Sequence, residues 1–349
     1  MRTKSSGISP VLALAAMFSL AALLFIALLS GREGGRWTLA AGGGGVYAAP
    51  GNTFACASST GLRVYGEDGG QLLSIERRLE SPALSAAGDY LAAWDAGGEE
   101  LLFAGGTQGL LEVETGGELV SARVNEGGFL AVAALGGGGL GTVTVYSPDG
   151  EAVYRWHAGT AWPLEGCVSP SGEYLAVLAA SEDGGQVRLF RLDGTEELWR
   201  ADTPGELPFA LGWLGEERLC AVSAGRALFL TPEGGLEAEQ GFGPLSARRC
   251  SFGEGFAVAE LADGEGRCTL VSLSAEGERL GRLELDRTPL DLSLRGERAL
   301  LLLDGETRLL DSSLSELGAR AAEGAVAALL AGNGEAILVR RGWAEAVYI

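Results

Sequence analysis

Lysine and histidine are almost absent from this sequence. Lys4 is the only lysine and His157 the only histidine, and 46 acidic residues against 26 lysines and arginines give a formal charge of −20. A nucleic-acid-binding protein needs a basic stripe, and the chain has none, so that class is excluded. One histidine also rules out a histidine-based zinc site, and a Ser-His-Asp triad would have to be built around His157.

Cysteine is scarce too, and the signatures of several kinds of site are missing. The five cysteines contain no CxxC pair, which argues against a cysteine zinc site and a dense disulfide framework. Cys250 and Cys268 fall within one repeat and could form a disulfide, but the favoured interpretation is small buried side chains in strands. No G-x-S-x-G elbow or calcium-loop pattern occurs, and the glycine run 136–141 is interpreted as a flexible loop. We therefore expect neither a cofactor nor a bound metal.

One long apolar run is present near the amino terminus, at residues 11–29, and it carries no charge. At about 1.5 Å per residue it matches the roughly 30 Å hydrocarbon core of a bilayer. A cleaved signal peptide is the alternative, but Leu28-Leu29-Ser30 lacks the small residues that signal peptidase requires. The prediction is a cytoplasmic tail (1–10), an uncleaved transmembrane helix (11–30), a linker (31–35) and an extracytoplasmic remainder.

The remainder is built from copies of one phrase. "CVSPSGEYLAVL" (167–178) has near copies in "LSAAGDYLAAWD" (84–95) and "RVNEGGFLAVAAL" (123–135). Five weaker copies are "YAAPGNTFACAS" (47–58), "WLGEERLCAVSA" (213–224), "CSFGEGFAVAEL" (250–261), "LSLRGERALLLLD" (292–304) and "LLAGNGEAILVRR" (329–341). Each is an apolar run, a tight turn and a second apolar run, a pattern typical of paired strands.

A second hairpin follows most copies, as in "VTVYSPDGEAVYRW" (143–156) and "VRLFRLDGTEELW" (187–199). Four strands, a to d, therefore repeat with a mean spacing of about 40 residues, the length of a β-propeller blade. The last unit, residues 325–349, supplies strands a, b and c, and residues 36–41 can supply its outer strand. The prediction is an all-β propeller over residues 36–349 with eight four-stranded blades, closed by the N-terminal strand; seven blades is the alternative.

"SARVNEGGFLAVAAL", "GTVTVYSPDGEAVYRWHAGTAW" and "CVSPSGEYLAVL", read in order, resemble an uncharacterised family of propeller-type proteins from clostridia-like bacteria. The resemblance implies a single N-terminal membrane helix and an extracytoplasmic propeller, and it implies no activity. The chain departs from that family at His157-Ala158 and at Trp162, where Tyr-Ser and Tyr are expected.

Three units are longer than the others, and the extra residues are predicted to form loops between strands b and c, at 135–141, 181–186 and 262–267. These loops share a face with the d–a connections, which is commonly the binding face of a propeller. The densest aromatic cluster, 155–162, lies in one such connection. Predicted ligand- or partner-binding residues on this face are Trp156, His157, Trp162, Gly138, Gly139 and Asp183, with tryptophans that brace the blades as the alternative.

Function is predicted only by class. The leading hypothesis is a non-catalytic binding or scaffold module for an envelope protein or cell-wall component, anchored to the membrane and without a nucleic-acid partner. The alternatives are a sensory or assembly subunit of an envelope complex, and a hydrolase or lyase that uses carboxylates in the propeller channel.

Overall fold

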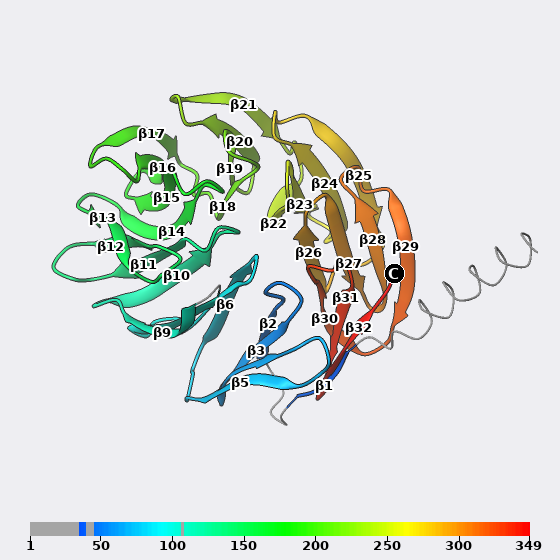
Figure 1. Cartoon of the computed structure of the whole chain (residues 1–349). Coiled ribbons are helices and arrows are strands. Elements are labelled where there is room, and N and C mark those ends of the chain that lie inside the picture. Colours follow the sequence, from blue (N-terminus) through cyan, green and yellow to red (C-terminus); the bar gives the residue numbers. More distant parts are fainter. Residues whose placement is uncertain (1–34, 40–44, 106–107) are drawn as a thin grey trace, which may run out of the picture.

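The structure is a computed structural model that describes residues 35–39, 45–105 and 108–349. Every regular element in these ranges is a β-strand, and the strands form eight sheets of four antiparallel strands arranged in a ring (Figure 1). The described residues include no helix long and apolar enough to span a membrane. The predicted tail and transmembrane helix, 1–30, lie outside the described ranges.

Each sheet is one blade, and its strands run from the inside (a) to the outside (d) of the ring. Blades 1 to 4 are β2 (Gly45–Ala48), β3 (Phe54–Ser58), β4 (Gly61–Tyr65), β5 (Gln71–Glu76); β6 (Pro82–Ala87), β7 (Tyr90–Asp95), β8 (Glu100–Gly105), β9 (Gln108–Glu114); β10 (Glu118–Val124), β11 (Leu130–Leu135), β12 (Gly141–Tyr146), β13 (Ala152–Ala158); and β14 (Trp162–Val168), β15 (Tyr174–Ser181), β16 (Gly184–Arg191), β17 (Glu197–Pro204).

Blades 5 to 8 continue the same order around the ring. They are β18 (Ala210–Trp213), β19 (Leu219–Val222), β20 (Arg226–Thr231), β21 (Gly235–Gly241); β22 (Ser246–Phe252), β23 (Phe256–Ala262), β24 (Cys268–Ser274), β25 (Arg279–Leu285); β26 (Asp291–Arg295), β27 (Arg298–Leu303), β28 (Gly305–Asp311), β29 (Glu316–Ala322); and β30 (Ala325–Leu330), β31 (Ala336–Arg340), β32 (Trp343–Val347), β1 (Arg36–Thr38).

The eight-bladed ring and its closure by the N-terminal strand are confirmed. β1 pairs antiparallel with β32, placing Arg36 opposite Glu345 and Thr38 opposite Trp343. The Trp37 indole reaches further, into blade 1, where its Nε1 donates to the Gly66 carbonyl at 2.7 Å. The closing strand therefore completes blade 8 and also fastens it to blade 1.

Hydrogen bonds between inner strands link one blade to the next. The Ser121 hydroxyl donates to the Leu164 carbonyl at 2.9 Å, and the Leu330 amide donates to the Ser293 hydroxyl at 3.2 Å. The partners are separated by 43 and 37 residues, which is one repeat in each case. A repeat thus places a polar side chain of one strand a beside the backbone of the next, and this holds the inner ring together.

The predicted loop at 181–186 is wrong. β15 and β16 extend through it, and only Glu182 and Asp183 remain as a two-residue turn. The glycines of this segment are typical of a loop, but Gly184 has a φ of 145° and pairs with both Ser181 and Pro204. A glycine lengthens the strand here because a Cβ would collide with the Thr203 carbonyl of the neighbouring strand.

The suggested disulfide between Cys250 and Cys268 is absent, and both thiols are free. β23 lies between their strands, so the two Cα atoms are separated by at least about 9 Å, beyond the roughly 7 Å limit of a disulfide. All five cysteines lie in strands, in line with the favoured interpretation. Burial raises the pKa of Cys250 and of Cys167 to about 12, so neither is a reactive thiolate at neutral pH.

Candidate functional site

A cavity of about 1300 Å³ lies at the end of the channel where the inner strands of blades 7, 8, 1 and 2 begin. Its wall continues from these inner strands onto the middle strands of blade 1, including Ser58 and Arg63, and onto the b–c turn of blade 8, Arg341-Gly342. The cavity therefore combines the channel mouth with the cleft between blades 8 and 1, where the ring closes.

Exposed apolar side chains surround this mouth. Val46, Leu290 and Val326 line the cavity, and their residues are 36, 46 and 54 % exposed. Phe209 occupies the same repeat position in blade 5 and is also exposed. Solvent-facing apolar groups at one repeat position are not needed to pack a blade, and grouped around a cavity they are typical of a binding surface.

Three charged side chains line the cavity: Arg63, Arg341 and Asp291. The Asp291 carboxylate accepts hydrogen bonds from the amides of Leu292 at 2.9 Å and Ala328 at 3.1 Å. Burial raises the pKa of Asp291, and these two hydrogen bonds oppose the rise. Asp291 thus links blade 7 to blade 8 through the hydrogen bond from Ala328. The charged side chains of the cavity that remain without a partner in the described part of the chain are the two arginines.

A row of side chains crosses the face of blade 1 that lines this cavity. Tyr47, Cys56 and Arg63 are direct cross-strand neighbours on β2, β3 and β4, so all three point to the same side of the sheet. Burial raises the pKa of Cys56 to about 11, although the nearby Arg63 lowers it. The row therefore presents a phenol, a neutral thiol and a guanidinium.

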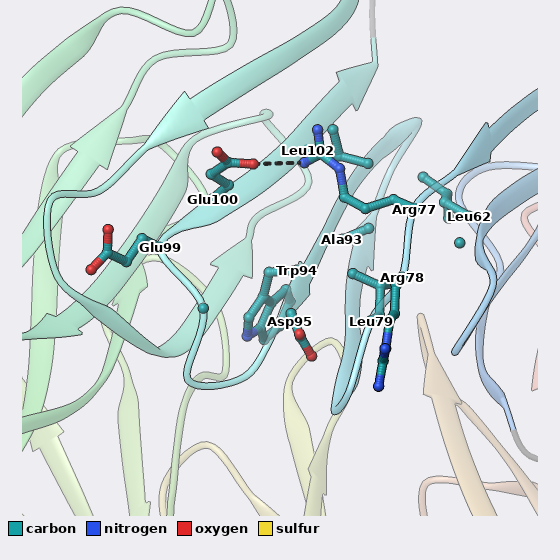
Figure 2. A pocket seen from close by; sticks show the side chains of 12 residues that line it. Leu62, Arg77, Arg78, Leu79, Ala93, Trp94, Asp95, Glu99, Glu100 and Leu102 are labelled. Carbon is teal, nitrogen blue, oxygen red and sulfur yellow. Dashed lines mark ion pairs between the residues drawn. The ribbon is translucent and has the colours of Figure 1, made fainter.

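A smaller pocket of about 230 Å³ lies between blades 1 and 2 (Figure 2). Several of its charged groups are already engaged: Arg77 forms 3.1 Å ion pairs with Glu100 and with the nearby Glu112, and Asp95 accepts backbone hydrogen bonds. Trp94 lines both this pocket and the large cavity, and its buried Nε1 has no acceptor among the described residues. Because the pocket is small and Arg77, Glu100 and Asp95 are engaged within the fold, the large cavity is the stronger candidate.

The predicted site residues lie on the face that carries the cavity mouth, but they are not one cluster. Gly138 and Gly139 are in the b–c turn of blade 3, Asp183 is in that of blade 4, and Trp162 begins β14. All belong to the end of the ring that carries the cavity mouth. None of them lines the cavity itself, because it lies at blades 7, 8, 1 and 2.

Trp156 and His157 lie within strand β13 rather than in a connection. Successive strand residues point to opposite faces, so the two side chains diverge. The half-buried Trp156 ring packs 5.7 Å from Phe190 of blade 4, and the Arg188 guanidinium lies 5.3 Å from it. Trp156 thus packs as a brace between blades 3 and 4, while His157 and Trp162 are exposed.

Sequence reasoning missed the cavity at the ring closure because it followed aromatic density. The usable signal was the repeat itself: large apolar residues recur at the start of strand a in Val46, Phe209, Leu290 and Val326. Their exposure, however, depends on which turns cover them, and this becomes visible only in three dimensions.

Comparison with known proteins supports an uncharacterised propeller domain. Residues 40–189, which span blades 1 to 3 and most of blade 4, match a family model described as a family of unknown function (DUF5711). A search of curated protein sequences finds no significant match. The clostridial origin and the single membrane helix implied by the resemblance above stay predictions.

Many solved structures share the fold. BamB from Moraxella catarrhalis aligns with a TM-score of 0.58 and 13 % identity, covering 90 % of this chain and 98 % of that one. The C-terminal WD40 domain of Sif2 gives 0.60 and 11 %, covering 87 % and 97 %. Chaetomium thermophilum Sqt1, solved bound to the N-terminus of ribosomal protein L10, gives 0.58 and 12 %, covering 85 % and 94 %. At such low identities the likeness establishes the propeller fold alone.

Proposed function

We propose that this chain is a membrane-anchored, extracytoplasmic binding module whose channel mouth receives a segment of an envelope protein partner, without catalysis. The observation that carries the proposal is the 1300 Å³ cavity with exposed apolar side chains at its mouth. Sqt1, a propeller of the same fold, was solved with a peptide segment of its partner bound. A carboxylate-dependent hydrolase is less well supported, because Asp291 is the one carboxylate among the described residues that line the cavity.

The place where the N-terminal strand enters the propeller indicates which face of the ring is nearer the membrane. The Gly35 carbonyl accepts from Ala346, near the end of β32, and Leu39 donates to Gly342 in the b–c turn. The closing strand β1 therefore begins at the face opposite the mouth and runs toward the mouth. A five-residue linker, 31–35, spans at most about 18 Å. With the predicted anchor at 11–30, the opposite face lies next to the bilayer and the mouth faces away from it.

The face next to the bilayer is strongly acidic. Its a–b and c–d turns contain one described basic residue, Arg218, and many carboxylates. They are Glu67, Asp68, Asp89, Glu126, Asp149, Glu151, Glu173, Asp193, Glu196, Glu216, Glu217, Glu233, Glu254, Glu276, Glu278, Glu297 and Glu335. Anionic lipid headgroups repel such a face, so the propeller stands off the membrane and keeps its mouth accessible.

A photoreactive amino acid placed at Val326 in the full-length chain tests the binding role in the cells that carry it. We expect irradiation to join Val326 to one defined protein, identified by mass spectrometry, because this side chain is 54 % exposed and lines the cavity. Leu317 is the matched control, since it is 55 % exposed but lies on the outer strand of blade 7. The same adducts from both positions, or none from Val326, would contradict the proposal.

Protease added outside intact cells tests the location. The full-length protein should sediment with membranes, and its propeller should be digested from outside, because an uncleaved helix at 11–30 leaves the bulk of the chain beyond the bilayer. Immunoblotting of the membrane and soluble fractions reports both results. A soluble form that begins after residue 30 would show that the apolar run is a signal peptide.

A further inference from the structure

An arginine recurs at one position of strand c in three blades. In these blades strand c pairs with strand d, and a β-bulge interrupts the pairing just before the last paired residue of strand c. The arginine, Arg63, Arg188 or Arg308, lies two residues before that last paired residue. The bulge falls at the same place in all three blades, between Val64 and Tyr65 in blade 1. The three arginines are therefore structurally equivalent, and each side chain points toward the preceding blade, as Arg188 does toward Trp156.

Blades 4 and 7 supply carboxylates for this arginine. Arg188 pairs with Glu197 at 2.5 Å, and Arg308 pairs with Glu306 at 2.5 Å and Glu316 at 3.9 Å. Glu197 and Glu316 are the first residues of the outer strands β17 and β29. The outer strand thus provides the partner of Arg188, and strand c itself provides the closer partner of Arg308.

Blade 1 lacks both partners. Gln71 is the first residue of β5 and lies opposite Tyr65, the place that Glu197 takes opposite Phe190. Gly61 stands where blade 7 has Glu306, two residues before the arginine. Among the residues that the structure describes, Arg63 forms neither an ion pair nor a hydrogen bond. Its charge is consequently available inside the cavity.

A second unpaired arginine lines the same cavity. Arg341 lies in the b–c turn of blade 8, across the cleft from blade 1, and has no acidic partner in the described ranges. The Tyr47 hydroxyl, in the same row as Arg63, adds a neutral donor. In a chain with a net charge of −20, two unpaired guanidiniums in one cavity favour an anion, because carboxylates and phosphates match the guanidinium fork.

We propose that the cleft between blades 8 and 1 binds an anion, a carboxylate or phosphate group, through Arg63 and Arg341. This proposal specifies a chemical group of the ligand that enters the channel mouth, and it rests on the proposed binding role. Asp291 is the one carboxylate among the cavity-lining residues that the structure describes, and it is held on the inner strand of blade 7 by the amides of Leu292 and Ala328. The anion takes the place that Glu197 occupies beside Arg188.

Calorimetric titration of the full-length chain in neutral detergent tests the site, with citrate and inorganic phosphate as probes and succinamide as the uncharged control. We expect at least one anion to bind and succinamide not to bind. Arg63→Gln should weaken binding at least tenfold by removing the guanidinium. Gln71→Glu should do the same while keeping the guanidinium, because it restores the internal partner found in blade 4.

Two matched variants control for charge alone. Arg279→Gln removes an exposed arginine from the outer strand of blade 6, and Gln240→Glu adds a carboxylate to that of blade 5. Both should bind as the wild type does. Anion binding should also slow alkylation of Cys56, which neighbours Arg63, and leave that of Cys250 unchanged.

The possible outcomes separate the site from the proposed function. Binding of phosphate without citrate, or the reverse, identifies which anion the site prefers and supports it. The proposal is overturned if neither anion binds, or if Arg63→Gln and Gln71→Glu bind as well as the wild type. Anion binding together with no crosslinked partner at Val326 would remove the proposed function and leave the anion site in place.

Discussion

Trp37→Ala is expected to destabilise the propeller by about 3–5 kcal/mol, the usual range for emptying a buried aromatic site. Trp37 is 1 % exposed and stacks on Phe54 with ring centroids 5.3 Å apart. Its Nε1 also satisfies the Gly66 carbonyl at 2.7 Å, and an unsatisfied buried acceptor adds about 1–3 kcal/mol. These contacts belong to the strand that closes the ring without a covalent bond, so their loss opens blade 8 as well as its junction with blade 1.

Urea denaturation of the full-length chain, followed by circular dichroism, measures this effect. Trp37→Phe separates the two contributions, since it keeps an aromatic ring but loses the indole N–H. Trp162→Ala is the control, because Trp162 is 41 % exposed and its removal should cost less than about 1 kcal/mol. Equal losses for Trp37→Ala and Trp162→Ala would contradict closure by the N-terminal strand.

The blade count could be predicted because each repeat carries its own turn chemistry. Gly150 and Gly172 have φ of 79° in the turns of the quoted phrases, and such turns fix where strands end. In every blade the copy of the repeated phrase covers the end of strand a, the a–b turn and all or most of strand b. The exception at 181–186 arose because glycine permits both a loop and a close strand pair, and only the neighbouring strand decides between them.

The cavity and its unpaired arginine could not be predicted in the same way, because whether a charge is paired depends on which residue lies opposite it. Arg63 has the same strand position as Arg188, and sequence pattern alone does not distinguish them. The difference is Gln71 in place of Glu197, which matters only once the two outer strands are known to be equivalent. Aligning the blades strand by strand, rather than searching for aromatic clusters, would have exposed the missing carboxylate.

Arg123→Met is expected to destabilise the propeller by about 2–3 kcal/mol, because it removes a half-buried ion pair and a hydrogen bond from a charged donor. Arg123 lies on the inner strand of blade 3 and pairs with Glu165 of blade 4 at 2.8 Å. It also donates to the Leu211 carbonyl of blade 5, and its guanidinium lies 5.5 Å from the Phe252 ring of blade 6. One side chain thus ties four consecutive inner strands together.

Arg123 keeps its charge although it is partly buried. Desolvation is the largest single influence and lowers its pKa, but the ion pair and hydrogen bond with Glu165, together with the nearby Cys167 and Cys250, raise it, and the pKa ends above the ordinary value. Arg123→Met leaves Glu165 without its cation, and the added Glu165→Gln change should restore part of the lost stability. A double-variant cycle by urea denaturation measures this coupling, with Arg282→Met as the control because its partner Glu284 is exposed. An exposed pair contributes less than about 1 kcal/mol. An Arg123→Met loss no larger than that of Arg282→Met would show that Arg123 does not hold the four inner strands together.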